Sequence, residues 1–582
     1  DDDWGGGGLP PTSVPFIEDR TGSSGLGKDE IDALKGGGSS CTSKVVYPYE
    51  STTFPGGLLP PPIMWTGGGD SAYVHVQYPT VPEVLKYEFA VKASGELTIP
   101  AEDCTQNTPL VVTLNVKKGS SVSTCKLNWN IARGNMVGAV YYNTYNHPDT
   151  AGLGAVMRIT LGKKQAEVYS SSVAGTIPSG PCRSCHSVSA TGNMMVSSEH
   201  FYFPFGNYFN VSSFKVTEKT QPAILKDLAD ITFAAITPDG SKVFKMGNPQ
   251  CTAGASTFPR APNNFMLAQG PTKPGLIDPN TGAAITTNGI NANHYMWMPQ
   301  FSPDGKKIVF NHAKPAGTGT DRFELATMDF NSATNTFSNL KVIVTKNLDP
   351  KITFKKYSPG APLGGIGGGV DPFGAQCSPV LSGDAALGAI DNGSCSGPCY
   401  PAWPFFTPDG NGVIYSMISE PDFAVAFPGR DVASRSELWY VDLTTGERVK
   451  LANANKGLPE DDEDINYYPT VLPVQIGGYY WVVFTSTRKW GTRVTEAKPE
   501  ETLAYEATFG ATAREAFKKR LWVSAIKPRL REGGEFETDK LVDPSSPPFY
   551  LEGQSATGNT RAFAALNPCK AEGGTCTSGL DC

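Results

Sequence analysis

The sequence predicts an all-β protein: an N-terminal β-sandwich, then a β-propeller of about five to seven blades, then a short cysteine-rich tail. Two observations lead to this fold class. The 582 residues include 63 Gly and 47 Pro, and only 18% are charged. Helix-period runs are scarce, and this composition is typical of many short strands joined by turns. A strand–turn–strand unit also recurs through the second half of the chain.

The first 178 residues divide into two regions. Residues 1–44 contain two glycine runs with scattered Ser, Pro and acidic residues, which predicts a Gly/Asp-rich tether or a strap lying on another domain. Residues 45–178 contain short segments with alternating and β-branched residues, which predict a β-sandwich domain. We expect its internal disulfide to join Cys104 and Cys125, which flank one of these segments. The predicted strands are 73–78, 87–91, 110–116 and 139–142.

The repeated unit consists of a strand, a Pro-Asp-Gly turn and a second strand. Complete copies have their turns in 236–240, 301–305 and 406–410. Pro presets the first turn residue and Gly supplies the positive φ that a tight hairpin needs. Residues 188–192 form a degenerate copy, and a fifth begins at Tyr468 with its turn at Gly477-Gly478. Four-stranded repeats of this kind predict a propeller over residues 179–565.

These F-[ST]-P-D-G-x-x-[IV] units resemble the propeller repeats of the Tol-type periplasmic family, relatives of the WD repeats, over about residues 186–545. The resemblance concerns the fold and implies no activity, because such propellers bind proteins, sugars, metals and cofactors alike. The tail, 566–582, contains Cys569, Cys576 and Cys582 and resembles the start of a small knotted cysteine module. The whole arrangement resembles secreted proteins of predatory δ-proteobacteria, which again implies no activity.

The run Cys182-Arg183-Ser184-Cys185-His186 has the C-x-x-C-H spacing that attaches a c-type haem. Cys182 and Cys185 can form thioethers to the two vinyl groups, and His186 then lies under the iron as the proximal ligand. A disulfide hairpin and half of a zinc site are the alternatives. A zinc site would need a second closely spaced pair, and Cys395 and Cys399 have a different spacing. The motif therefore predicts one covalently bound haem c.

The cysteine count and the haem motif together predict a location outside the bacterial cytoplasm. Ten cysteines remain beside the two of the motif, an even number that suits disulfide formation. No apolar run is long enough to span a membrane. The chain begins at Asp1 without Met or a signal peptide, which we interpret as a mature, processed form; the protein is then secreted, periplasmic, or a lipoprotein at the cell surface. A net charge of −7 offers no basic surface for nucleic acid.

The second axial ligand of the iron decides between electron transfer and catalysis. Each Pro-Asp-Gly turn lies at one face of a propeller, so residues before the first strand and after the second lie at the opposite face. His186 precedes a first strand, as do His294 and Met298, which are the candidate distal ligands. Packing or surface roles are the alternative for both. Further candidates by the same logic are Met194, Met195, His200, Met246, Met296, His312 and Met417.

Three functions are compatible with these features. The first is a c-type cytochrome that transfers electrons to a redox partner protein. The second is a haem peroxidase or oxidase with an open iron and His294 or His312 as the distal acid-base group. The third is a secreted binding or self-assembling structural protein in which the haem is minor. Calcium is a further candidate cofactor, because the acidic run 460–464 could bind it, although such a run is usually a solvated loop.

Overall fold

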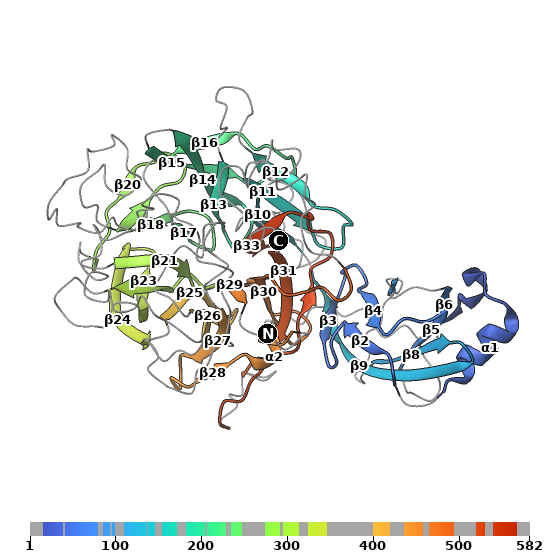
Figure 1. Cartoon of the computed structure of the whole chain (residues 1–582). Helices are drawn as coiled ribbons and strands as arrows, with labels where there is room; N and C mark the ends of the chain where they lie inside the picture. The colour runs from blue at the N-terminus through green and yellow to red at the C-terminus, as the bar shows by residue number, and fades with distance from the viewer. Residues whose placement is uncertain are drawn as a thin grey trace, which may run out of the picture.

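A computed structural model shows a six-bladed β-propeller with an N-terminal β-rich region at its side (Figure 1). The structure describes the following residues: 16–38, 41–78, 85–92, 96–98, 110–136, 138–145, 154–171, 182–203, 206–228, 234–246, 274–290, 295–313, 324–345, 400–418, 436–457, 465–493, 519–529 and 539–566. The cysteine-rich tail and the acidic run 460–464 lie outside them.

The N-terminal region contains a six-stranded sheet, in the order β1-β6-β5-β8-β9-β3, and a three-stranded sheet, β2-β4-β7. Residues of both sheets belong to one hydrophobic cluster. The elements are β1 (Phe16–Asp19), η1 (Thr21–Ser24), α1 (Lys28–Gly36), β2 (Lys44–Tyr47), β3 (Thr53–Gly56), β4 (Pro62–Thr66), β5 (Ser71–Gln77), β6 (Leu85–Lys92), β7 (Glu96–Thr98), β8 (Leu110–Lys118) and β9 (Ser121–Asn135).

The segment expected to be a tether is in part an element of this region. Strand β1 pairs in parallel with β6. Asn115 of β8 donates a hydrogen bond of 2.7 Å to the carbonyl oxygen of Leu34, which is fully buried at the end of α1. Leu34 supplies the buried apolar contact that a Gly-rich strap needs to become ordered. Residues 16–36 are therefore part of the N-terminal region: β1 is a strand of its sheet, and α1 is held to β8.

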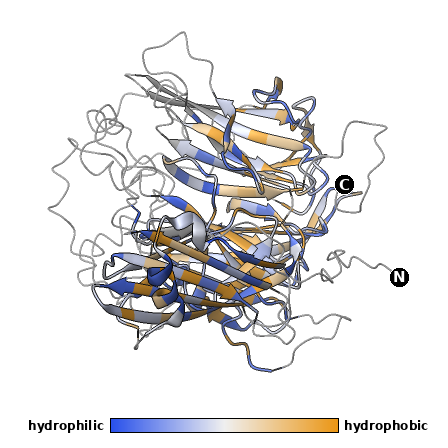
Figure 2. Ribbon diagram, turned by 90° about the vertical axis from the view of Figure 1, so that its right-hand side faces the viewer, coloured by the Kyte–Doolittle hydropathy of each residue, from blue (hydrophilic) through white to orange (hydrophobic). Residues whose placement is uncertain are grey.

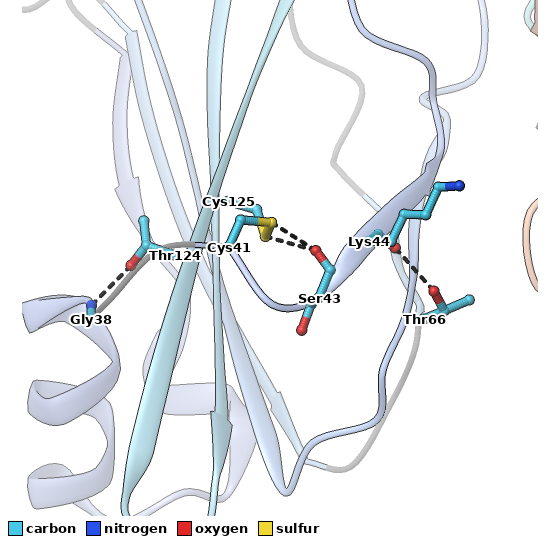
Figure 3. Close-up of a disulfide and its surroundings, with 7 residues drawn as sticks. All are labelled: Gly38, Cys41, Ser43, Lys44, Thr66, Thr124 and Cys125. Atoms are coloured by element: carbon cyan, nitrogen blue, oxygen red, sulfur yellow. Dashed lines mark hydrogen bonds between the residues drawn. A yellow bond between two sulfur atoms is a disulfide. The ribbon is translucent and has the colours of Figure 1, made fainter.

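The disulfide of this region joins Cys41 and Cys125, with Cα atoms 4.6 Å apart (Figure 3). The expected pairing of Cys104 with Cys125 is therefore wrong. Cys41 lies just before β2, and the Ser43 carbonyl oxygen is 2.7 Å from its sulfur and 2.9 Å from that of Cys125. The expectation rested on closeness in sequence, whereas the bond links residues 84 positions apart. It fastens the segment that follows α1 to β9.

Six four-stranded antiparallel sheets form the blades. Blades 2 to 6 are each a consecutive set of strands, with the innermost strand first. Their bounds are β13 (Cys182–Val188), β14 (Met194–Phe203), β15 (Gly206–Lys215), β16 (Ile224–Asp227); β17 (Ala234–Ile236), β18 (Val243–Lys245), β19 (Gly275–Ile277), β20 (Ala284–Ile285); β21 (Tyr295–Phe301), β22 (Lys307–Ala313), β23 (Glu324–Asn331), β24 (Thr336–Val344); β25 (Tyr400–Phe406), β26 (Gly412–Ile418), β27 (Ser436–Asp442), β28 (Arg448–Lys450); and β29 (Asn466–Val471), β30 (Tyr480–Ser486), β31 (Arg520–Ile526), β32 (Phe549–Tyr550). A short helix, α2 (Ala452–Asn455), follows β28.

Blade 1 is built from both ends of the propeller sequence. Its outer strands are β10 (Ala139–Tyr145), β11 (Ala155–Thr160) and β12 (Glu167–Ser171), and its innermost strand is β33 (Gly558–Ala565). Strand β33 pairs with β10 and also contacts β29 and β13, the inner strands of blades 6 and 2. The ring is thereby closed by the C-terminal strand. The sequence analysis assigned 139–171 to the N-terminal domain, and the hydrogen bonding instead places these strands in the propeller.

The Pro-Asp-Gly turns connect the first and second strands of blades 3, 4 and 5, as the sequence predicts. In blade 4, Gly305 has φ of 67° and its N–H donates a bond of 2.8 Å to the Ser302 carbonyl oxygen. The Ser302 hydroxyl donates to Asp304 Oδ1 at 2.6 Å. Thr237 and Thr407 make the same contacts in their blades. The degenerate copy forms the turn between β13 and β14, and Gly192 has φ of 71° there.

Hydrophobic residues are distributed along the strands of both parts of the molecule (Figure 2). The largest cluster continues from the N-terminal sheets into blade 6, so the two parts share a core. At their junction the Tyr550 N–H donates a hydrogen bond of 3.0 Å to the buried Tyr47 hydroxyl. The Tyr49 ring stacks on that of Trp522, with centroids 6.4 Å apart. Aromatic packing of this kind fixes the N-terminal region against the side of the propeller.

Candidate haem site and axial hollow

The C-x-x-C-H motif lies on β13, the innermost strand of blade 2. Its pairing with β14 is interrupted by a bulge between Ser184 and Ser187, so Cys185 and His186 are the bulged residues. A bulge changes the direction in which its residues point. Cys185 and His186 therefore lie at a bulge in the innermost strand of blade 2. The side chains of Cys182 and Cys185 lie outside the described residues.

His186 is fully buried between blades 1 and 2. Its Nδ1 is 2.7 Å from Oδ1 of Asn143, and its Nε2 is 3.1 Å from the carbonyl oxygen of Tyr141. Both partners belong to β10. The Asn143 amide is oriented by its Nδ2, which donates a hydrogen bond of 3.2 Å to the Arg183 carbonyl oxygen. The ring also meets Phe563 of β33 edge to face, with centroids 5.2 Å apart.

The pKa of His186 is lowered to about 3, chiefly by burial; the bond to the Tyr141 carbonyl oxygen raises this pKa and the positive charge of Arg561 lowers it. The imidazole is therefore neutral at pH 7 and carries one ring proton. Two acceptor oxygens face its two nitrogens, so one nitrogen presents a lone pair to an oxygen. In a state in which Nε2 bound iron, the ring proton would be on Nδ1, where Asn143 Oδ1 can accept it. The lone pair is then on Nε2.

This donor set fits an axial ligand of haem c. Iron-bound histidines are neutral and commonly donate the other ring N–H to an oxygen, which fixes the ring and raises its basicity. His186 has both properties and directly follows the two cysteines. In the structure Nε2 faces the Tyr141 carbonyl oxygen, so iron binding requires the ring to move away from this oxygen while Nδ1 stays with Asn143.

The prediction that His186 and Met298 precede the first strands of their blades is wrong, because both lie within the inner strands, His186 in β13 and Met298 in β21. Cys182 pairs with His200, Met296 with His312, and Pro401 with Met417, all at the strand ends away from the Pro-Asp-Gly turns. His294 lies outside the described residues. His312 packs beside Glu324, with Nδ1 3.6 Å from Oε2.

Met298 reaches the propeller axis. It is 1% exposed and belongs to a cluster with Met246, Trp403 and Tyr468. The other methionines of the candidate set have different positions: Met296 packs between blades 3 and 4, and Met194 and Met195 belong to the cores around blade 2. Of the described candidate methionines, Met298 and Met246 belong to this cluster, and Met298 also lines the hollow between the inner strands.

A small hollow, with room for about one water molecule, is lined by the inner strands of blades 4, 5, 6 and 1. Arg561 of β33 is its one side chain that is charged at neutral pH. The guanidinium carbon of Arg561 lies 4.8 Å from the centre of the Trp403 ring and 5.2 Å from that of Phe563. Because Phe563 also contacts His186, the hollow adjoins the histidine. The lining residues are Met298, Gln300, Trp403, Pro404, Phe405, Tyr468, Pro469, Thr470, Arg561 and Phe563.

The inner strands share a bulge at the same level. In β21, β25 and β29 the bulged pairs are Met298-Pro299, Trp403-Pro404 and Tyr468-Pro469, which correspond to Cys185-His186 in β13. Arg561 is the extra residue of β33. His186 thus occupies the position that proline has in three other blades. This correspondence could have been found in the sequence, because each pair lies two residues before the last hydrophobic residue of its strand.

Sequence analysis missed Asn143, Tyr141 and Arg561 as residues of this region. Asn143 and Tyr141 lie in a segment assigned to the N-terminal domain, and Arg561 lies in a strand without a Pro-Asp-Gly turn. Only ring closure brings these strands beside β13. Within the described ranges, no group of three or more His, Cys, Asp or Glu side chains is arranged to hold a metal ion. The predicted calcium run lies outside them.

The fold and this region define an all-β protein built on a six-bladed propeller. The sequence matches no known protein family profile and no curated protein. Among solved structures, it is similar to Kuenenia stuttgartiensis hydrazine synthase, with 11% identity and a TM-score of 0.27 over 71% of this chain and 89% of that one. It is also similar to an oligogalacturonate lyase from Vibrio parahaemolyticus, with 10% identity and a TM-score of 0.30 over 65% of this chain and 82% of that one.

Proposed function

We propose that this protein is an extracytoplasmic c-type cytochrome that holds one haem covalently on blade 2 and transfers electrons to a redox partner protein. The observation that carries the proposal is the C-x-x-C-H motif on an inner strand, with a buried neutral His186 held at Nδ1 by Asn143. When bound, a haem c supplies an iron that cycles between two oxidation states.

The residues of the chain have distinct tasks in this proposal. Cys182 and Cys185 would attach the haem, and His186 would bind its iron through Nε2. Asn143 Oδ1 would accept the Nδ1 proton, which would leave the Nε2 lone pair for the iron. Phe563, packed against the ring, shields it from water. Met298 and His294 are the candidate distal ligands, and the position of Met298 at the axis favours it.

The location outside the cytoplasm is part of the proposal. The disulfide between Cys41 and Cys125 is compatible with an oxidising compartment, where haem c is also assembled. Within the described residues, no helix is long and apolar enough to cross a membrane. Calcium binding by the acidic run 460–464 is a second, independent proposal.

A redox titration followed by visible absorption tests this function. We expect a reversible one-electron change and a low-spin spectrum in both states. Met298→Ala should convert the spectrum to high spin and let carbon monoxide bind, whereas Met417→Ala, a buried methionine outside the axial cluster, should leave it low spin. If Met298→Ala has no effect, His294→Ala is the next variant. A native protein that is already high spin would contradict electron transfer and favour the peroxidase or oxidase alternative.

A further inference from the structure

The N-terminal segment, residues 16–38, is held by contacts that are mostly polar, and its helix α1 packs against β5 and β8. Among its described side chains only Leu34 and Thr21 are buried, and Leu34 alone is apolar. The Ser71 hydroxyl donates a hydrogen bond of 2.6 Å to Oε1 of Glu30. The ion pairs of the segment involve exposed or half-buried side chains, and such pairs add little stability. The segment therefore gains little free energy from burial.

The face of the sheet under α1 is itself polar. Val74 and Leu114 belong to the apolar cluster on the other face. Tyr73 and Asn115 precede or follow them by one residue, so they point toward α1. They are only 4% and 3% exposed, whereas Thr113, on the same face, is half-buried. Within the described residues Oδ1 of Asn115 is buried without a hydrogen-bond partner, and such an acceptor destabilises the arrangement that buries it.

The end of the segment is fastened to β9 by a close backbone contact and by a covalent bond (Figure 3). The Gly38 N–H donates a hydrogen bond of 2.9 Å to the Thr124 hydroxyl. A Cβ at Gly38 would lie 1.7 Å from the Val122 carbonyl oxygen, so this approach requires glycine. Three residues later, Cys41 is bonded to Cys125 of the same strand. The bond keeps a weakly held segment at a high local concentration over the sheet.

The two ends of this disulfide differ in their access to solvent. Cys41 is exposed, and Cys125 is 3% exposed and belongs to the apolar cluster. Disulfides exchange by attack of a thiolate on one sulfur, and access decides which sulfur is attacked. An external thiolate can therefore reach the sulfur of Cys41 while the sheet stays folded.

We propose that the Cys41–Cys125 disulfide is an exchange site for an external dithiol, and that its reduction releases residues 16–38 from the sheet. A thiolate of the dithiol attacks Sγ of Cys41, the S–S bond breaks, and Cys125 leaves as a thiolate and takes up a proton. The second thiolate of the dithiol then displaces Cys41, which also takes up a proton. The protein disulfide gains two electrons and two protons, and the dithiol becomes a disulfide. This site is independent of the proposed electron transfer.

The first test uses the full chain and dithiothreitol as the dithiol. Thiols are alkylated after increasing times, and amide hydrogen exchange is followed by mass spectrometry. We expect Cys41 and Cys125 to become alkylated while the thermal transition is retained. Exchange at residues 28–36 should then become at least about tenfold faster, since loss of a disulfide typically shifts an equilibrium by more than this. Exchange in β30 should stay unchanged, and reoxidation should restore the protection of α1.

Cys41→Ala tests the covalent bond without the reductant, which also reaches other cysteines. Because Cys41 is exposed, this change removes the bond and no buried contact. Thr42→Ala, at the exposed neighbouring position, keeps the bond and is the matched control. We expect faster exchange at residues 28–36 in Cys41→Ala and native exchange in Thr42→Ala.

Three results would overturn the proposal. The first is that Cys41 and Cys125 become alkylated only when the thermal transition is lost. The second is that residues 28–36 keep their protection once the bond is absent. The third is faster exchange throughout the molecule, which would make the bond a support of the whole fold. If Cys41→Ala does not fold, the reductant experiment on the unmodified chain decides between these results.

Discussion

At the scale of single residues, His186 depends on contacts that come from a distant part of the sequence. The motif alone predicts the residue and its chemistry. The structure adds that the ring is buried against β10 and that its pKa is lowered to about 3. Asn143 could not be predicted, because it lies 43 residues away in a strand of another blade. Local spacing identifies a ligand, whereas the residue that orients it depends on which strands become neighbours.

The lowered pKa predicts a pH dependence of stability in the haem-free variant Cys182→Ala/Cys185→Ala. In the unfolded chain His186 takes up a proton near pH 6.5, whereas in the folded chain it does so only near pH 3. The unfolded state therefore binds more protons between these values, and the free energy of unfolding falls as the pH falls, by up to about 1.4 kcal/mol per pH unit.

The measurement is the urea midpoint between pH 7 and pH 5, compared with the same variant carrying His186→Gln. The difference between the two slopes isolates the histidine from the carboxylates, which also protonate. Parallel slopes would show that His186 is not held neutral in the folded protein.

At the scale of elements, the Pro-Asp-Gly hairpins follow directly from the sequence. The turn chemistry is local: Gly at positive φ and a Ser or Thr hydroxyl bonded to the Asp are both encoded within five residues. The closing strand β33 was not recognised because its residues carry no turn signal and its partner β10 lies some 400 positions earlier. Whether a segment forms a strand depends mainly on its own residues, whereas the strand it pairs with depends on the whole fold.

Two glycines of equivalent turns give a matched test of this picture. A Cβ at Gly410 would meet nothing within 4 Å, so Gly410→Ala adds only the left-handed backbone penalty of about 1–2 kcal/mol. At Gly192 a Cβ would lie 2.0 Å from the Leu566 carbonyl oxygen, just after β33. Gly192→Ala should therefore destabilise the protein clearly more than Gly410→Ala in thermal unfolding. Equal effects would place the end of β33 away from the blade 2 turn.

At the scale of the whole molecule, the ring is held closed by β33 and the N-terminal region is held against blade 6. The blade number of six falls within the predicted range. Strands β10 to β12 belong to the propeller and not to the N-terminal domain, and no local sequence pattern indicates that blade 1 is shared between the two ends of the propeller. The Cys41–Cys125 bond was likewise a long-range contact that spacing could not indicate.

Ring closure predicts the effect of removing β33. A chain that ends after residue 557 lacks the inner strand of blade 1 and exposes the faces of β10, β29 and β13. Compared with a chain that ends after residue 566, it should lose its cooperative thermal transition and expose apolar surface to a hydrophobic dye. The comparison removes the cysteine-rich tail from both chains. Equal transitions would mean that the propeller does not need this strand to close.

The central claim is that one haem is covalently bound at Cys182 and Cys185. The most direct test is the mass of the denatured protein, purified from a host that matures c-type cytochromes, together with its pyridine haemochrome spectrum. We expect the mass of the chain plus one haem, a spectrum of the two-thioether type, and the loss of both in Cys182→Ala/Cys185→Ala. The bare chain mass, or a haem that acid acetone extracts, would contradict the claim.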